Sequence, residues 1–296
     1  MIPVNYQRRL LPLLILFSIV ITSCGGVGNQ TPTGTATTVP PTRTPFPPSP
    51  TPIPTAAVVN DEAITLAEFQ EELARYQAAV GRDLTDEDSE IVIQNLIDLT
   101  LLAQAARTEG FQVSDQELEN RFEALNGTDG SLQDWLAEYG YTENSFRAAL
   151  KKSIAAAWMR DEILNDVPLE MEQIRAQQIL FYEQAQAQSV LDTLNSGAAF
   201  GTQAAQYDPQ TKGELGWFPR GYLILSELDD ILFVLEAGEM TGIIETEIGY
   251  HIIKVIDKSE NRPLDPAVYQ VIQQQSLEDW LARRRKLSTI TITLPQ

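Results

Sequence analysis

Two residues in this 296-residue sequence stand out by their chemistry, the single histidine His251 and the single cysteine Cys24. A zinc site of the Cys/His type draws on several such ligands, and a disulfide framework needs paired cysteines. One residue of each type supplies neither. We therefore expect no metal site and no cofactor, and the chemistry of the chain must be of a kind that one imidazole and neutral groups can support.

Carboxylates are abundant, with 41 Asp and Glu against 21 Lys and Arg, a formal net charge of −20. In the segment 57–167, most Asp and Glu lie on the predicted outer faces or first turns of helices, where they are solvated or complement the helix dipole. We therefore interpret them as surface charge rather than as paired catalytic acids. The negative charge also opposes the phosphate backbone, so nucleic acid is not an expected partner.

The first 23 residues are typical of an export signal. Arg8 and Arg9 precede the uncharged run from Leu10 to Thr22, which is short for a membrane span. The run ends in Ile21-Thr22-Ser23-Cys24-Gly25-Gly26, which resembles a bacterial lipobox whose cysteine receives lipid. The alternative is an ordinary signal peptide with a cysteine there by chance. We expect residues 1–23 to be removed and lipidated Cys24 to anchor the chain to the membrane, on the extracytoplasmic side.

Residues 24–56 are predicted to be a linker. Pro32 to Pro54 contains nine of the 17 prolines, interleaved with threonine. Such a run favours extended, solvated polyproline II and does not form a packed core. After removal of residues 1–23, 19 basic and 41 acidic residues leave a charge of −22, which anionic lipid repels. A covalent anchor would therefore hold the body at the membrane.

The segment 57–167 is predicted to be mostly helical. A short strand, Ala56–Val59, precedes a turn at Asn60-Asp61, and Thr65-Leu66-Ala67-Glu68 is typical of a capping box at a helix start. A second box begins at Ser114, and further helices are predicted at 91–109, 131–139 and 142–165.

The apolar stripes of these helices allow two interpretations. The helix at 91–109 carries Ile93, Leu96, Ile97, Leu101 and Leu102 on one side. Such stripes either pack as core or line a cradle that holds unfolded segments, and periodicity alone does not separate the two.

Strands and helices interleave in the next segment. Strands are predicted at 175–181, 242–246 and 250–257, and helices at 183–195, 200–207 and 226–235. This pattern favours a compact α+β domain.

The same segment carries several short motifs in a fixed order. They are Phe200, Ala204 to Tyr207, Gly213-Glu214-Leu215-Gly216-Trp217-Phe218, Arg220-Gly221, Phe233, Gly238-Glu239 and Gly249-Tyr250-His251-Ile252-Ile253-Lys254-Val255. Over residues 171–259 the chain thereby resembles the parvulin (PpiC) family of peptidyl-prolyl cis-trans isomerases. With the helical segment, the lipobox and the tail, it resembles extracytoplasmic foldases of the SurA and PrsA kind.

The tail favours an inserted arrangement of domains. Asp265–Leu287 is a predicted helix that ends in Arg283-Arg284-Arg285-Lys286, a cluster that either complements the helix dipole or forms an anion site. Ser288–Leu294 alternates like a strand and is predicted to pair with 56–59. We therefore expect an α+β chain: a mostly helical SurA-like chaperone domain, 57–167 plus 262–296, with a parvulin domain, 171–259, inserted. The parvulin domain would have a small, mainly antiparallel sheet with surrounding helices.

The resemblance also implies site residues. Leu215, Leu223, Leu228 and Phe233 would form an apolar pocket for the proline ring, with Thr246 as a polar position. His251 matches one of the two active-site histidines of the family, and Gln178 stands where the other would be. Asp208 stands at the position that holds Cys or Asp. Strand alternation predicts that His251, Ile253 and Val255 share one side.

Two main functions follow. In the first, the chain is a prolyl isomerase that assists folding of unfolded or Pro-containing exported polypeptides, with reduced activity because Gln178 does not titrate. In the second, it is a holding chaperone, and His251 is a structural residue. A third hypothesis is that the chain is a lipid-anchored assembly subunit that binds one fixed partner.

Overall fold

The structure is a computed structural model that describes residues 53–126, 131–225 and 227–294. The predicted signal peptide, Cys24 and nearly all of the predicted linker lie outside the described residues. Within the described part of the chain, no helix is long and apolar enough to span a membrane. The chain divides into two compact units. One comprises the described residues up to Met159 together with those from Arg284 onward, and the other comprises Arg160–Arg283.

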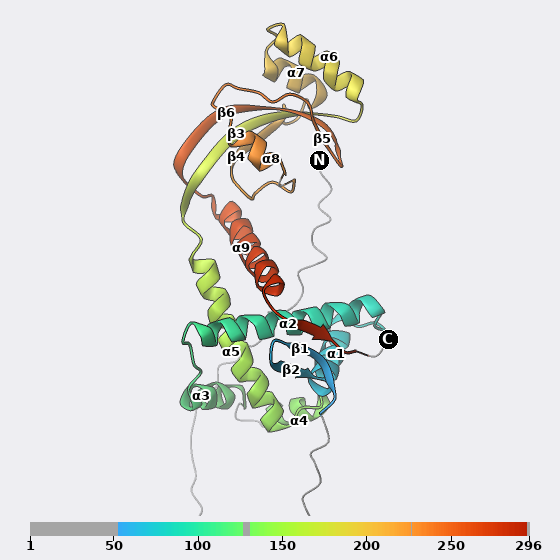
Figure 1. Ribbon diagram of the computed structural model, residues 1–296, viewed down its shortest axis with the longest axis vertical. Coiled ribbons are helices and arrows are strands. Elements are labelled where there is room, and N and C mark those ends of the chain that lie inside the picture. The colour runs from blue at the N-terminus through green and yellow to red at the C-terminus, as the bar shows by residue number, and fades with distance from the viewer. Residues whose placement is uncertain (1–52, 127–130, 226, 295–296) are drawn as a thin grey trace, which may run out of the picture. The chain divides into compact units, whose positions relative to one another are not determined.

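Both ends of the chain contribute to the sheet of the first unit (Figure 1). Its strands are β1 (Thr55–Val59), β2 (Glu62–Thr65) and β7 (Ile290–Ile292), in the order β2-β1-β7 and antiparallel throughout. Ala57 pairs with Ile292, which confirms the predicted pairing of the tail with the first strand. The sequence analysis missed β2, which follows Asn60 at φ 55°, a turn residue in the left-handed region.

In the described chain, five helices lie between β2 and the next strand. They are α1 (Leu66–Val80), α2 (Asp86–Thr108), α3 (Asp115–Asn126), α4 (Ser131–Glu138) and α5 (Glu143–Asn165), whose last residues belong to the second unit. Their positions match the predicted helices, with shifts at the ends.

Capping boxes explain where two of these helices start. The predicted box is present at α1, where Thr65 Oγ1 accepts from the Glu68 backbone N at 3.1 Å and Glu68 accepts from the Thr65 backbone N at 2.8 Å. An equivalent box of Thr85 and Asp88 starts α2 five residues earlier than predicted. At α3, Ser114 Oγ accepts from the Glu117 backbone N at 3.1 Å.

The apolar stripe of α2 is core. Ile93, Ile97 and Leu101 are fully buried and pack with Val59 and Ile64 of the sheet. The cradle interpretation therefore fails for this stripe, because its side chains are already covered within the first unit.

The basic cluster at the end of α9 (Pro266–Lys286) contributes an ion pair to the first unit. Arg285 Nε lies 2.7 Å from Asp98 Oδ1, and Arg285 also donates to the Gln94 carbonyl at 3.3 Å. This contact fixes the end of α9 to α2 and supports neither of the two interpretations offered for the cluster.

The second unit is built on a four-stranded antiparallel sheet in the order β4-β3-β6-β5. Its elements in chain order are β3 (Glu170–Phe181), α6 (Gln184–Asn195), α7 (Phe200–Tyr207), β4 (Glu214–Pro219), α8 (Glu227–Leu232), β5 (Ile244–Thr246), β6 (Gly249–Pro263) and most of α9.

Helices cover both faces of this sheet (Figure 1). Ile179, Phe181 and Ile252 pack under α6 and α7 on one face. Ile253 and Val255 pack under α8 on the other. The α+β fold class, with a largely helical unit closed by both chain ends and an antiparallel unit between them, is confirmed. The boundaries 57–167 plus 262–296 and 171–259 stay a prediction.

Candidate active site

His251 lies at the start of β6, on the face covered by α8. It pairs with Leu180 of β3 on one side and Ile244 of β5 on the other. Side chains alternate along a strand, and Ile253 and Val255 lie in the α8 cluster while Ile252 lies in the opposite one. This agrees with the prediction that residues 251, 253 and 255 share one side. The imidazole is buried, with 1% of the residue exposed.

One hydrogen bond orients the imidazole. His251 Nε2 lies 2.8 Å from Thr246 Oγ1, and the same hydroxyl donates to the Gly249 carbonyl at 3.2 Å. A hydroxyl has a single proton, so it accepts from the ring, and Nε2 carries the hydrogen. Nδ1 is then a buried acceptor that has no partner in the described part of the chain. Burial lowers the pKa of His251, against a small opposing effect of the Glu227 carboxylate, so the ring is neutral at pH 7.

A tight turn brings Thr246 to His251. Thr246 pairs with Gly249, whose φ is 138°. A Cβ on Gly249 would lie 2.3 Å from the Phe181 carbonyl oxygen, so only glycine allows the turn to lie this close to β3.

The four predicted pocket residues lie in one cluster, but they differ in exposure. Leu228 and Phe233 are 4% and 3% exposed and pack with Ile253 as core. Leu215 and Leu223 are half-buried at the edge of the same cluster. Only these two therefore present an appreciable apolar surface that a ligand can reach.

Gln178 lies on the same sheet face as His251. It pairs with Ile253, two residues beyond His251 on β6, which makes it a diagonal neighbour of the histidine. Its backbone N donates to the Gly213 carbonyl at 2.8 Å. Its side-chain amide makes no hydrogen bond within the described residues, so it does not complete a network with His251.

Asp208 is not joined to His251. Its Oδ1 accepts from the backbone N atoms of Gln210 and Thr211, both at 3.1 Å, and Oδ2 accepts from the Thr211 hydroxyl. These bonds lower the pKa of Asp208. The carboxylate thus shapes the loop that ends at Gly213, where a Cβ would lie 2.0 Å from the Gln178 carbonyl oxygen.

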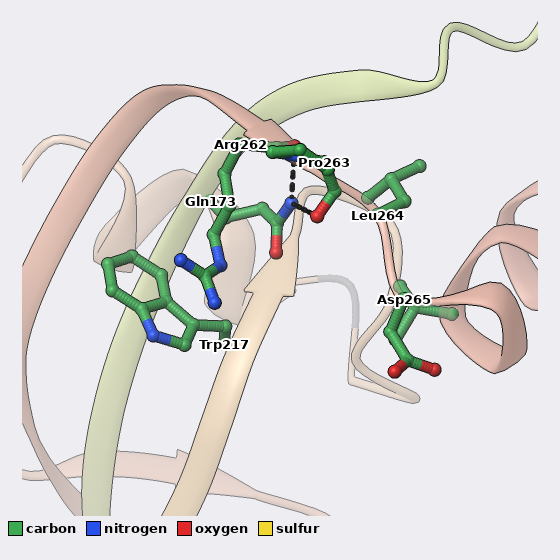
Figure 2. A pocket seen from close by; sticks show the side chains of 7 residues that line it. Gln173, Trp217, Arg262, Pro263, Leu264 and Asp265 are labelled. Carbon is green, nitrogen blue, oxygen red and sulfur yellow. Dashed lines mark hydrogen bonds between the residues drawn. The ribbon is translucent and has the colours of Figure 1, made fainter.

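No group of three or more potential metal ligands occurs among the described residues. A pocket of about 450 Å³ lies elsewhere in the second unit. Figure 2 shows the Gln173 amide bonded to the carbonyls of Arg262 and Pro263, with Trp217 and Asp265 nearby. Gln173 is seven positions from Leu180 on β3, roughly 23 Å of strand. This hollow is therefore not the predicted proline pocket.

The sequence analysis missed one buried polar group beside the apolar cluster. Asp229 is 8% exposed and lies between Leu228 and Asp230 on α8. Its neighbour Asp230 is exposed, although both acids lie in the same short helix. The spacing of Leu228, Leu232 and Phe233 alone does not reveal that Asp229 faces inward.

Two family profiles match the chain. The profile described as SurA-like N-terminal domain covers residues 6–160, and that described as PPIC-type PPIASE domain covers residues 170–257. The chain belongs to the SurA-like N-terminal domain family. Residues 170–257 form a PPIC-type peptidyl-prolyl isomerase domain, so the expected isomerase and the resemblance to SurA- and PrsA-type foldases are confirmed.

The chain is similar to several proteins named as PrsA foldases or isomerases. The foldase protein PrsA of a Geobacillus species is 29% identical over 218 residues, which cover 69% of this chain and 72% of the relative. PrsA of Caldanaerobacter subterraneus is 27% identical over 229 residues, covering 67% and 72%. A crystal structure of the peptidylprolyl isomerase PrsA from Bacillus cereus is 21% identical and covers 76% of this chain and 82% of that one, with a TM-score of 0.43.

Proposed function

We propose that this chain is an exported foldase that accelerates X-Pro rotation in unfolded polypeptides at the α8 face of the second unit. The observation that carries the proposal is the 2.8 Å hydrogen bond between Thr246 and the buried His251. It lies next to Ile244, which packs against the apolar cluster that Leu215 and Leu223 extend to the surface.

The reaction needs no covalent step. Resonance holds the X-Pro amide planar behind a barrier of about 18–20 kcal/mol, and uncatalysed exchange takes tens of seconds or longer. In the twisted transition state conjugation is lost, and the demands at nitrogen and carbonyl oxygen change. An enzyme accelerates rotation by binding this state better than the planar amide.

Each candidate residue has a part in such a site. Leu215 and Leu223 would hold the proline ring against a fixed apolar base. Gln178 has amide hydrogens without a partner in the described chain, so they are available to the carbonyl oxygen of the twisted amide. Thr246, half-buried and hydrogen-bonded to the neutral, buried His251, would supply a fixed polar edge, and His251 would hold it in place rather than act as an acid or base.

Two substitutions test this site with a matched control. Leu223→Asp puts a charge where the ring would bind, and His251→Ala removes the group that holds the Thr246 hydroxyl in place. We expect each to lower kcat/KM for a Pro-containing tetrapeptide at least tenfold, about 1.4 kcal/mol. Ile224→Asp is the control, because Ile224 is 85% exposed. If Leu223→Asp and His251→Ala both behave like Ile224→Asp, the site is wrong.

A holding chaperone with little turnover is the second candidate. Gln178 does not titrate, and the Asp208 carboxylate is committed to its own loop. Suppression of aggregation of a denatured client separates the two functions. A holding role predicts full suppression by His251→Ala and no isomerisation by the wild type, whereas the foldase proposal predicts measurable isomerisation.

Anchoring through Cys24 is part of the proposal. It rests on the lipobox-like residues and on the predicted linker, 24–56, which would hold domains 57–167 plus 262–296 and 171–259 on the extracytoplasmic side. Cells fed a labelled fatty acid should label the wild-type chain and not Cys24→Ser. Equal labelling of both chains would refute the anchor.

A further inference from the structure

The loop that carries Leu223 has no regular secondary structure of its own. It runs from Gly221 to Leu225 between β4 and α8. Tyr222 N donates to the Pro219 carbonyl at 3.3 Å, and the Leu225 carbonyl accepts from Leu228 N at 3.0 Å. Among the described residues, no hydrogen bond involves Leu223 or Ile224, so their placement depends on how the ends of the loop are held.

Asp229 holds the first end of this loop. Its Oδ2 accepts from the Gly221 backbone N at 2.6 Å. Gly221 has φ 82°, in the left-handed region, so the chain turns sharply at this residue. Arg220 Nη1 reaches back to the Asp229 carbonyl at 3.5 Å, which adds a weaker link between the same two segments.

Burying a carboxylate to make one hydrogen bond is unfavourable in free energy. Asp229 Oδ1 is buried and has no hydrogen-bond partner among the described residues, and burial raises the pKa of the group. Removing a carboxylate from water without satisfying both oxygens opposes folding. Because the buried carboxylate of Asp229 opposes folding and bonds the loop 221–225, its role is better explained by the position of that loop than by the stability of the fold.

The position of Asp229 on α8 connects the loop to the base of the site. Leu228 and Leu232 on the same helix are buried against Ile253 of β6. The carboxylate is therefore attached to a rigid part of the α8 face. Through Gly221 it sets the distance between Leu223 and that face.

We propose that Asp229 is a positioning residue: through its bond to Gly221 it sets the position of Leu223, which forms one wall of the proline site. The inference rests on the proposed function, because it takes Leu223 to contact the proline ring. Holding this wall affects planar and twisted amides alike. Asp229→Ala should therefore raise KM by about tenfold, as expected for loss of a hydrogen bond to a charged group, while kcat changes less than about twofold.

The experiment is a double-mutant cycle on the full chain with a chromogenic Ala-Lys-Pro-Phe tetrapeptide, at a temperature well below the unfolding midpoint. If Asp229 acts through Leu223, Asp229→Ala raises KM in the wild type but adds less than about twofold in Leu223→Ala. Asp229→Asn keeps an acceptor for Gly221 N and should restore KM to within about threefold of wild type. Asp230→Ala, an exposed acid on the same helix, is the control.

The outcomes separate the inference from the proposed function. If Leu223→Ala raises KM and Asp229→Ala does not, or if their effects multiply independently, the inference fails and the site stands. If Leu223→Ala changes neither kcat nor KM, the proposed site fails. If the role of Asp229 were purely structural, Asp229→Ala would lower the unfolding midpoint without changing KM. If Asp229→Ala does not fold, Asp229→Glu takes its place, because it keeps the carboxylate but displaces it by one methylene.

Discussion

Replacing Gln178 by histidine should increase the isomerase activity of this chain. Gln178 and His251 face the same side of the sheet as diagonal neighbours, a pairing with Cα atoms roughly 7–8 Å apart. Two imidazoles on such positions come within hydrogen-bond reach. His251 Nδ1 is a buried acceptor with no partner, so a second ring that donates to it would satisfy a group that is now unsatisfied.

The size of the gain follows from one hydrogen bond. A neutral hydrogen bond contributes about 1 kcal/mol net, which corresponds to roughly fivefold in rate if the paired rings stabilise the twisted amide by that amount more than the planar one. We therefore expect Gln178→His to raise kcat/KM about fivefold in a protease-coupled assay at pH 7.5. A protonated imidazole still donates, and His251 stays neutral because burial lowers its pKa, so the gain should persist between pH 7.5 and about pH 6.5.

A neighbouring glutamine provides the control. Gln177 points to the opposite face of β3 and donates to Glu214 Oε1 at 2.9 Å. Gln177→His should leave the rate unchanged. A folded Gln178→His protein with wild-type or lower kcat/KM would refute the view that the missing histidine limits turnover here.

Three further predictions concern stability. Thr246→Val leaves His251 Nε2 buried without its acceptor and should lower the free energy of unfolding by about 1–3 kcal/mol in urea titrations, whereas no loss would mean that the ring finds another partner. The Arg82 guanidinium and Thr85 hold the pKa of the Asp88 carboxyl below its usual 3.8. Its contribution to the free energy of unfolding is therefore present above pH 3.8 and is lost as the pH falls toward the folded-state pKa. The difference in free energy of unfolding between wild type and Asp88→Asn should shrink from pH 7 to pH 3, and a constant difference would contradict this. Arg285→Ala leaves Asp98 without its ion-pair partner and should lower the free energy of unfolding by about 1–2 kcal/mol, measured by thermal and urea unfolding. An unchanged free energy of unfolding would mean that the pair is merely a surface contact.

Local signals in the sequence predicted much of the fold. The hydroxyl and carboxylate spacing at Thr65 identified the start of α1, and alternation in the tail identified β7. The missed start of α2 has the same mechanism, with Asp88 in the place of the usual Glu or Gln. β2 was missed because four residues give too little alternation, although the Asn60-Asp61 turn before it is a hairpin signal.

The site was less predictable, because burial is a property of the assembled unit. Leu215, Leu223, Leu228 and Phe233 are alike as apolar residues, and only packing separates the buried pair from the half-buried pair. The Thr246–His251 bond was anticipated as two positions of a family pattern, not as a contact. Ser226 and Asp229 have the spacing of a capping box, as Thr85 and Asp88 do, but this spacing does not predict the bond from Gly221 to Asp229.

This difference in burial divides the apolar cluster into a base and a wall. Leu228 and Phe233 are core, so replacing them would disturb the sheet face before it altered any ligand contact. Leu223 belongs to a loop held mainly at its two ends, so changes there alter the width of the site without repacking the core. Substrate preference in this chain should therefore depend on the segment 221–225 and its attachment, while the strands that carry His251 provide a constant frame.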